Sequence, residues 1–521
     1  MRALEARRGE ETARPREAEP VHHWLIEADR LAGRTVDRAV VGHHTRRLRA
    51  IGWGRALAPP DEALWPEGDP PPRPGNSVRV LVDGSRAMPA IAQAIREARQ
   101  SVTIAGWSIT PSFRLVRDDP DAALRGNPDA TLHGDPGGDQ GVVLHDLLAD
   151  TAERIPVRVV LWAGAPLPLF RPWRRDVRTA VRELGHGSAI RCAIDRHERP
   201  LHSHHEKIVL VDEEIAFVGG IDITDFRGDR FDAPAHPPRE GVGWHDVAIE
   251  LRGPVVGDVA AYLRMRWAQV THEWLPRPVA PPPAGDITAQ FVATIPERIY
   301  STVPRGSFRI LEAYVRALRS AQHLIYLENQ FLWAPEIVAI LKDKLAQPPG
   351  DDFRMVVLLP ARPNSGGDDT LGQLAVLAEA DAGRGHFLAC SLYSHGAGVS
   401  HPVYIHAKVG IVDDAWLTVG SCNLNDHSLF NDTEANIVVC DAQLARDTRL
   451  ALWAEHLEMD ESALSGDAHL IVDRYWRPIA AEQEARRKAG QAPTHRLVRL
   501  PHVSKRSERL LGPLQGFVVD G

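Results

Sequence analysis

The stretch "HSHHEKIVLVDEEIAFVGGID", from His202 to Asp222, decides the fold because the chain repeats its pattern once. The second copy, "VYIHAKVGIVDDAWLTVGSCN", runs from Val403 to Asn423. Both copies contain His-x-Lys, four residues, Asp, six residues and a pair of small residues, and paired positions differ by 201. An internal repeat of this kind indicates a chain built from two related units.

Each copy predicts a strand, a tight turn and a second strand. The β-rich runs are "EKIVLVD" and "IAFVGG" in the first copy, and "AKVGIVD" and "WLTVGS" in the second. Side chains alternate faces along a strand, so the His and the Lys two residues later point the same way. The small residues that end each second strand allow close backbone approach. Each copy therefore presents an imidazole beside an ammonium group.

The segments before each copy predict the rest of the architecture. Each half has a helix-then-strand pattern, "AIREARQSVTIAGW" and "ALRSAQHLIYLENQ", followed by a short apolar run, "RVVLW" or "RMVVLL". Alternating helices and buried strands are typical of α/β proteins. We expect two tandem homologous α/β sandwich domains with mixed sheets, related by a pseudo-twofold axis and sharing one active site.

Proline-rich segments give the expected boundaries. Residues 1–75 form an N-terminal extension, disordered over its charged first twenty residues, with a helix and a proline-rich end. The first domain is expected over 76–275, a linker over 276–290 around "LPRPVAPPPAG", and the second domain with a C-terminal extension over 291–521.

Composition narrows the class of partner. The chain has 521 residues and a formal net charge of −8, which does not favour nucleic acid as a partner. Its four cysteines lack paired spacing and indicate reduced thiols. No run of 18 apolar residues and no secretory signal is apparent in the sequence. These features predict a cytoplasmic location, peripheral contact with a membrane where the substrate is a lipid, and no obligate protein partner.

The duplication has a chemical reason. One histidine cannot attack a phosphorus atom and also protonate the leaving oxygen on its opposite side. His205 and His406 together supply both groups, and Lys207 and Lys408 hold the non-bridging oxygens. This mechanism needs no metal and no other cofactor.

The two copies match the HxKxxxxD signature, and the chain resembles the phospholipase D superfamily, in its phospholipid-acting branch. The stretches "GNSVRVLVDG", "YLENQF", "WHDVAIELRGP" and "GSCNLNDHSLFNDTEANIVV" extend the resemblance over roughly residues 76–490. It implies hydrolysis of a glycerophospholipid to phosphatidic acid through a covalent phosphohistidine, with transphosphatidylation as a side reaction. It also implies His205 as nucleophile and His406 as acid and later base, although the symmetry of the motifs does not decide between them.

The resemblance assigns roles to further residues. It implies that Glu434 supports His205 and that Asp246 supports His406. Asp212 and Asp413 complete the motifs and are interpreted as residues that pin the turns. The candidate phosphate-binding residues are Lys207, Lys408, Gly220, Ser421 and Asn423. The first-half position that matches Asn423 is Asp222, so the two halves are expected to contact phosphate unequally.

Other interpretations of the same residues stay open. The activity alternatives are a cardiolipin synthase-like phosphatidyltransferase, a nuclease and a non-catalytic adaptor. A metal site in "HSHHEK" is disfavoured because neighbouring side chains on a strand diverge. Trp107, Trp162 and Trp416 are expected in the core and Cys422 in buried packing, whereas Tyr326 and Asn329 are either pocket wall or structural. Loops such as 117–141 are where we expect head-group selection.

Overall fold

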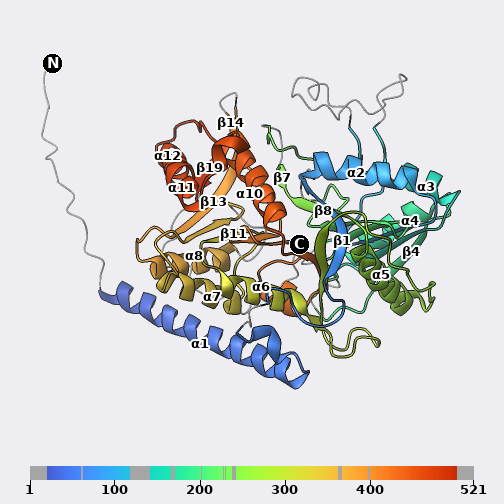
Figure 1. The fold of residues 1–521 in the computed structure, drawn as a ribbon, viewed down its shortest axis with the longest axis horizontal. Helices are drawn as coiled ribbons and strands as arrows, with labels where there is room; N and C mark the ends of the chain where they lie inside the picture. Colours follow the sequence, from blue (N-terminus) through green and yellow to red (C-terminus); the bar gives the residue numbers. More distant parts are fainter. Residues whose placement is uncertain are drawn as a thin grey trace, which may run out of the picture.

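The computed structural model in Figure 1 describes most of the chain. The described residues are 20–59, 63–117, 141–165, 171–200, 202–226, 228, 230–237, 242–361, 367–396 and 399–500. The expected disordered tail and nearly all of the 117–141 loop lie outside them.

The two halves of the chain have the same strand order. In the first sheet the order is β4-β3-β2-β5-β6-β8-β1, and in the second it is β13-β12-β11-β16-β17-β18-β9. In each sheet the first three strands are parallel to one another and the remaining neighbours are antiparallel. The fold is therefore α/β, with two tandem domains built around mixed sheets.

The first half forms one side of the molecule (Figure 1). Its strands are β1 (Arg73–Val82), β2 (Val102–Gly106), β3 (Val157–Trp162), β4 (Arg191–Asp195), β5 (Lys207–Val211), β6 (Ile215–Gly219), β7 (Trp244–His245) and β8 (Val247–Arg252). Its helices are α2 (Gly84–Glu97), α3 (Leu144–Ala152), α4 (Arg174–Gly185) and α5 (Val255–Thr271).

The second half forms the other side, with α1 (Pro20–Ala50) along its lower edge in the view of Figure 1. Its strands are β9 (Ile287–Ile295), β10 (Ser307–Phe308), β11 (Leu324–Glu328), β12 (Arg354–Leu358), β13 (Phe387–Gly396), β14 (Val399–Pro402), β15 (Tyr404–Ile405), β16 (Val409–Val412), β17 (Trp416–Gly420), β18 (Glu434–Val439) and β19 (Leu497–Arg499). Its helices are α6 (Arg309–Ser320), α7 (Pro335–Ala346), α8 (Gly367–Asp381), α9 (Asp426–Phe430), α10 (Ala442–Leu457), α11 (Ala468–Ile471) and α12 (Arg477–Lys488).

The strands are apolar on both faces because helices or the other half cover both faces. In β5, Ile208 and Leu210 belong to the central core, whereas Val209 and Val211 pack under α2, α3 and α4. The outer face of the second sheet is covered in the same way by α6, α7 and α8. Burial of each large aliphatic side chain contributes about 1.5–3 kcal/mol, so both faces stabilise the sheets.

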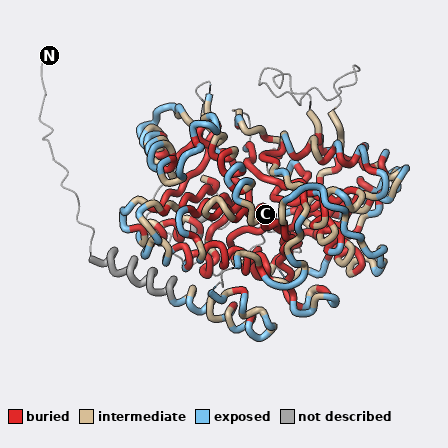
Figure 2. Tube along the Cα trace, viewed as in Figure 1, coloured by how far each residue is buried: buried red, intermediate tan, exposed pale blue. Residues whose placement is uncertain are grey.

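One continuous core joins the halves. Side chains from the inner faces of both sheets and from α5 and α10 form a single apolar cluster. The strands β6 and β8 contact β17 and β18 across this core. Figure 2 shows buried chain running through the centre, with exposed segments at the periphery. The ends of the motif strands therefore meet inside the molecule.

The strand β9 overlaps the end of the stretch predicted as a linker. The sequence predicts a linker over 276–290, but β9 begins at Ile287 and pairs with both β18 and β1. The stretch "ITAQFVATI" forms this strand because it pairs with β18 and β1 and so extends the second sheet.

Within the part of the chain that the structure describes, no helix has the length and apolar character needed to cross a membrane. The four cysteines are unbonded thiols.

Candidate active site

The aspartate of each motif closes the turn between the two motif strands. The carboxylate of Asp212 accepts hydrogen bonds from the backbone N–H groups of Arg99, Gln100 and Ser101, at 2.6–3.1 Å. In the second half, Asp413 accepts the N–H groups of 322, 323 and 324, each at 2.7 Å. Both aspartates thus lie at the far end of the strand from the histidine and tie the turn to the neighbouring helix-strand loop.

A backbone hydrogen bond links each motif histidine to the opposite half. The N–H of His205 donates to the carbonyl of Thr433 at 2.9 Å, directly before Glu434. The N–H of His406 donates to the carbonyl of His245 at 2.8 Å, directly before Asp246. The second bridge continues as the parallel pair β7 and β15.

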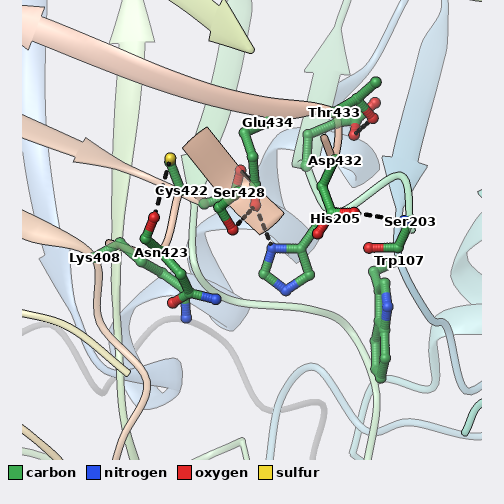
Figure 3. Close-up of polar contacts among 12 residues, drawn as sticks. Trp107, Ser203, His205, Lys408, Cys422, Asn423, Ser428, Asp432, Thr433 and Glu434 are labelled. Carbon is green, nitrogen blue, oxygen red and sulfur yellow. Dashed lines mark hydrogen bonds and ion pairs between the residues drawn. The ribbon is translucent and has the colours of Figure 1, made fainter. Parts of the chain in front are cut away.

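The crossed bridges place each histidine against a carboxylate of the other half. Nδ1 of His205 lies 2.9 Å from Oε1 of Glu434, and Nδ1 of His406 lies 2.6 Å from Oδ2 of Asp246. Figure 3 shows the first of these contacts. The two rings have centroids 6.5 Å apart and an interplanar angle of 68°. In each ring Nε2 lies on the side away from the carboxylate, as required for a group that reacts while its other nitrogen is held.

The small residues after each motif position these carboxylates. The hydroxyl of Ser421 donates to Oε2 of Glu434 at 2.5 Å, and that of Ser428 donates to Oε1 at 2.5 Å. At Gly220 any Cβ would lie 2.1 Å from Oδ1 of Asp246, and the Gly220 N–H already donates to Val247. The N–H of Gly220 and the hydroxyl of Ser421 are thus engaged within the protein. Their predicted phosphate contacts stay a prediction, which this arrangement does not favour.

The two lysines lie beside the histidines but have different neighbours. Nζ of Lys207 is 3.1 Å from Oδ2 of Asp222. Nζ of Lys408 donates instead to the uncharged Oε1 of Gln330 at 3.3 Å, and Nδ2 of Asn423 donates to the same oxygen at 3.4 Å. Figure 3 places Lys408 and Asn423 together on one side of His205. Asp222 and Asn423 occupy matching positions in the two halves. Lys207 therefore has a charged carboxylate beside it, whereas Lys408 contacts a neutral amide that Asn423 also contacts.

Burial shifts the proton affinities of this group. Burial lowers the pKa of Lys408 to about 7, and Lys207 and Arg230 act in the same direction. Burial also lowers the pKa of His406 well below its usual value, with Lys408 adding to the effect. Burial raises the pKa of Asp246 to about 6, against the opposing effect of Lys408. The site therefore holds, in Lys408 and His406, two groups that release their protons more readily than in water.

Aromatic rings and one arginine line the site without having been predicted there. Trp107 meets His205 edge-on, with ring centroids 6.3 Å apart, and Trp244 lies 4.6 Å from His406. The guanidinium of Arg230 lies 3.4 Å from the centroid of Trp244. Trp107 is buried, as expected, and its ring also contacts His205. Arg230 and Gln330 lie outside the motifs. Gln330 is the glutamine of "YLENQF", and that stretch is the signal in the sequence that could have indicated it.

The histidines of "HSHHEK" separate as the alternation of side chains requires. His204 contacts Thr433 and Asp195, whereas His202 contacts His427 and Asp432. The ring of His205 instead contacts Glu434. The three rings therefore do not share one metal centre.

The remaining residues named from the sequence are structural. Trp162 and Trp416 are fully buried, and Cys422 packs in the core of the second half. Oδ1 of Asn329 accepts the N–H groups of Phe331 and Leu424, both at 3.1 Å. Tyr326, also fully buried, donates to Glu328. The alternative left open for Tyr326 and Asn329 is thus decided in favour of a structural role.

Comparison with known proteins agrees with the duplication. Residues 94–243 match the family model described as phospholipase D, and residues 314–453 match the one described as cardiolipin synthase, PLD-like domain. Together the matches span more than half of the chain. The chain belongs to the phospholipase D superfamily.

Curated relatives carry the same names. Phospholipase D A of Dictyostelium discoideum is 26% identical over 490 residues, covering 74% of this chain and 36% of that protein. Phospholipase D2 of Bos taurus is 25% identical over 514 residues, covering 76% and 51%. Cardiolipin synthase A of Pseudomonas aeruginosa is 26% identical over 393 residues, covering 74% and 67%. The chain thus spans between a third and about half of the length of the first two.

Proposed function

We propose that the protein is a phospholipase D that hydrolyses a glycerophospholipid to phosphatidic acid and the head-group alcohol. The observation that supports this most directly is the crossed pair of histidines. His205 and His406 face each other at 6.5 Å between centroids, each with its Nδ1 held by a carboxylate from the other half. That spacing suits one phosphorus atom between two nitrogens.

The first chemical step is an in-line displacement. Nε2 of His205 attacks the phosphorus, and the bond from phosphorus to the head-group oxygen breaks. His406 gives its proton to that leaving oxygen, while Lys207 and Lys408 stabilise the charge on the non-bridging oxygens. The carboxylate of Glu434 stabilises the positive charge that develops on His205. The product of this step is a phosphatidyl group bonded to His205.

The second step transfers the phosphatidyl group from His205 to water. His406, now neutral, removes a proton from water, and the resulting oxygen attacks the phosphorus. The bond from phosphorus to His205 breaks, and phosphatidic acid leaves. An alcohol in place of water gives a new phosphodiester by the same bond changes. No step in this scheme routes through a metal or an organic cofactor.

A phosphatidyltransferase of the cardiolipin synthase type is the second candidate. It is supported by the family match over 314–453 and by the similarity to cardiolipin synthase A, of which this chain covers two thirds. The two candidates share the phosphohistidine and differ in the acceptor.

A product assay separates them. The purified protein is incubated with vesicles containing phosphatidylcholine, phosphatidylethanolamine and phosphatidylglycerol, and products are identified by mass spectrometry. Phosphatidic acid with free head group supports the phospholipase, and cardiolipin supports the transferase. The controls are His205→Ala, which should form neither product, and His386→Ala, which removes a buried histidine whose Nδ1 donates to the Phe353 carbonyl, away from the site. Absence of both products with the unaltered protein overturns the proposal.

A trapping experiment tests the role of His205. The variant His406→Ala lacks the base for the second step, so the phosphatidyl group should remain on His205 when a substrate with a good leaving group is used. Peptide mapping at alkaline pH, where phosphohistidine is stable, should locate it there. A label on His406 in the converse variant His205→Ala, together with no label on His205 in the His406→Ala protein, would exchange the two roles.

A further inference from the structure

A second group of histidines and carboxylates lies behind Asp246, where the two halves meet. It consists of Asp83, which directly precedes α2, His236, His245 in β7 and Glu455 in α10. Asp83, His236 and His245 are at most 2% exposed, and the side chain of Glu455 is 4% exposed. None of these four residues has a role in the chemistry described above.

The four side chains converge on one point. Nε2 of His236 and Nδ1 of His245 lie 2.9 and 3.1 Å from the same Oε1 of Glu455. Oδ1 of Asp83 lies 3.1 Å from Nδ1 of His245, and its Oδ2 lies 3.7 Å from Nε2 of His236. Ligand bonds of 2.0–2.2 Å in a tetrahedral zinc site place neighbouring ligand atoms about 3.3 Å apart. The observed separations scatter around this value.

Two of the converging atoms lack a well-formed hydrogen bond. Among the residues that the structure describes, Nδ1 of His245 and Oδ2 of Asp83 are buried and make no hydrogen bond of good geometry. The ring nitrogen has carboxylate oxygens at 3.1 Å on two sides but is directed at neither of them. Buried polar atoms are nearly always partnered, so these two indicate a shared partner between the side chains.

Each histidine is also supported on its other nitrogen. Nδ1 of His236 lies 3.1 Å from Oδ2 of Asp232, and Nε2 of His245 lies 2.9 Å from Oε2 of Glu328. Glu328 is held in turn by His456, whose Nε2 lies 2.8 Å from Oε1. A carboxylate on the far nitrogen fixes the tautomer and increases the basicity of a metal-binding imidazole. The arrangement repeats at both histidines.

We propose that Asp83, His236, His245 and Glu455 bind one divalent transition-metal ion, with Zn²⁺ the best match to the donor set. Two carboxylates balance the charge of the dication, and both imidazoles bind as neutral ligands. Four protein ligands leave no open position, so the ion is structural rather than catalytic. Glu455 also lines an open groove together with Pro234 and Glu458.

The site connects the halves at a sensitive position. Asp83 and His245 come from the first half and Glu455 from the second. Oδ1 of Asp83 accepts the N–H of Asp246 at 3.0 Å, and the N–H of Asp83 donates to the carbonyl of Asp246 at 2.8 Å. An ion bound here therefore fixes the backbone of the carboxylate that contacts His406.

Metal content of the intact chain tests the proposal. The full-length protein, purified without a histidine tag, should retain about one zinc per chain by inductively coupled plasma mass spectrometry. His236→Ala and Glu455→Gln should lose it, whereas His386→Ala, a buried histidine elsewhere, should keep it. Replacement by Co²⁺ should give the intense visible bands of tetrahedral coordination.

A thermal titration provides a readout that needs no variant. Protein stripped with dipicolinate should unfold at a lower temperature, and added Zn²⁺ should restore the midpoint with saturation at one equivalent. Asp232→Asn should weaken binding by about 10–100-fold. Absence of metal in the purified chain, together with no thermal response to Zn²⁺, overturns the proposal. Equal metal content in the unaltered chain and both ligand variants also overturns it, and two imidazolium protons then take the place of the ion. Neither readout depends on lipid turnover, so the result stands apart from the proposed phospholipase activity.

Discussion

Glu434 lies 2.9 Å from Nδ1 of His205 although the two residues are 229 positions apart and belong to different halves. The contact is buried, and the hydroxyls of Ser421 and Ser428 donate hydrogen bonds to the same carboxylate. The matching contact of His406 is with Asp246, so each motif histidine depends on the other half for the carboxylate at its Nδ1.

Replacing Glu434 by glutamine should abolish most of the activity. The amide keeps the size of the side chain but cannot stabilise a positive charge on His205, so turnover should fall by roughly 10³–10⁴-fold with little change in KM. Steady-state kinetics on vesicles measure this.

The matched control for this substitution is Glu336→Gln. Oε1 of Glu336 lies 2.8 Å from Nδ1 of His44, so it is also a buried glutamate against a histidine, but outside the site. This variant should keep near-normal turnover. A Glu434→Gln protein that keeps more than about a tenth of the turnover would contradict the role assigned to Glu434.

The two histidines should behave as one unit. His205→Ala or His406→Ala should each remove nearly all turnover, and the double variant should be no worse than either, because each step needs both groups. His386→Ala serves as the folding control. Single variants that each keep about half of the rate would indicate two independent sites and would overturn the shared one.

The sequence predicts the sheets well because their signals are local. Hydrophobic runs and the repeated spacing around Asp212 and Asp413 indicate two strands and a turn in each half, and the structure has them. The superfamily follows from the same spacing. These features depend on periodicity and on single turn residues, which are visible in one sequence.

The features that sequence could not predict are the ones that join the halves. Backbone hydrogen bonds link His205 to Thr433 and His406 to His245, in segments too short to have a strand pattern. Arg230 and Gln330 reach the site from loops without periodicity. The Asp83 cluster combines four separate segments, so no spacing motif marks it. In each case the position depends on tertiary packing rather than on local sequence.

Substrate capture should weaken above neutral pH because of Lys408. Its pKa of about 7 means that its charge is lost as the pH rises through 7 in the free enzyme. The groups that act on it are Asp246 and Glu434, which favour the charge, and Lys207 and Arg230, which oppose it. We expect kcat/KM to fall about tenfold per pH unit above this point, with a weaker effect on kcat because a bound phosphodiester favours the protonated lysine.

Lys408→Arg provides the check on this profile. Arginine stays charged throughout the measured range, so the alkaline fall in kcat/KM should disappear in this variant even where its absolute rate is lower. The profile is measured between about pH 6 and 9 with a short-chain soluble phospholipid, which avoids effects of pH on vesicles. The same alkaline fall in Lys408→Arg would assign it to another group.

The unequal lysines give a last prediction, at Asp222. Its Oδ2 lies 3.1 Å from Nζ of Lys207 and competes with a phosphate for that ammonium group, whereas the matching position beside Lys408 is the neutral Asn423. Asp222→Asn should therefore lower the inhibition constant of inorganic phosphate by about fivefold, equivalent to roughly 1 kcal/mol. Asp225→Asn makes the same charge change at an exposed aspartate three residues away and should have little effect. Weaker phosphate binding in Asp222→Asn would instead mean that Asp222 serves mainly to position Lys207, and that its negative charge costs the site little.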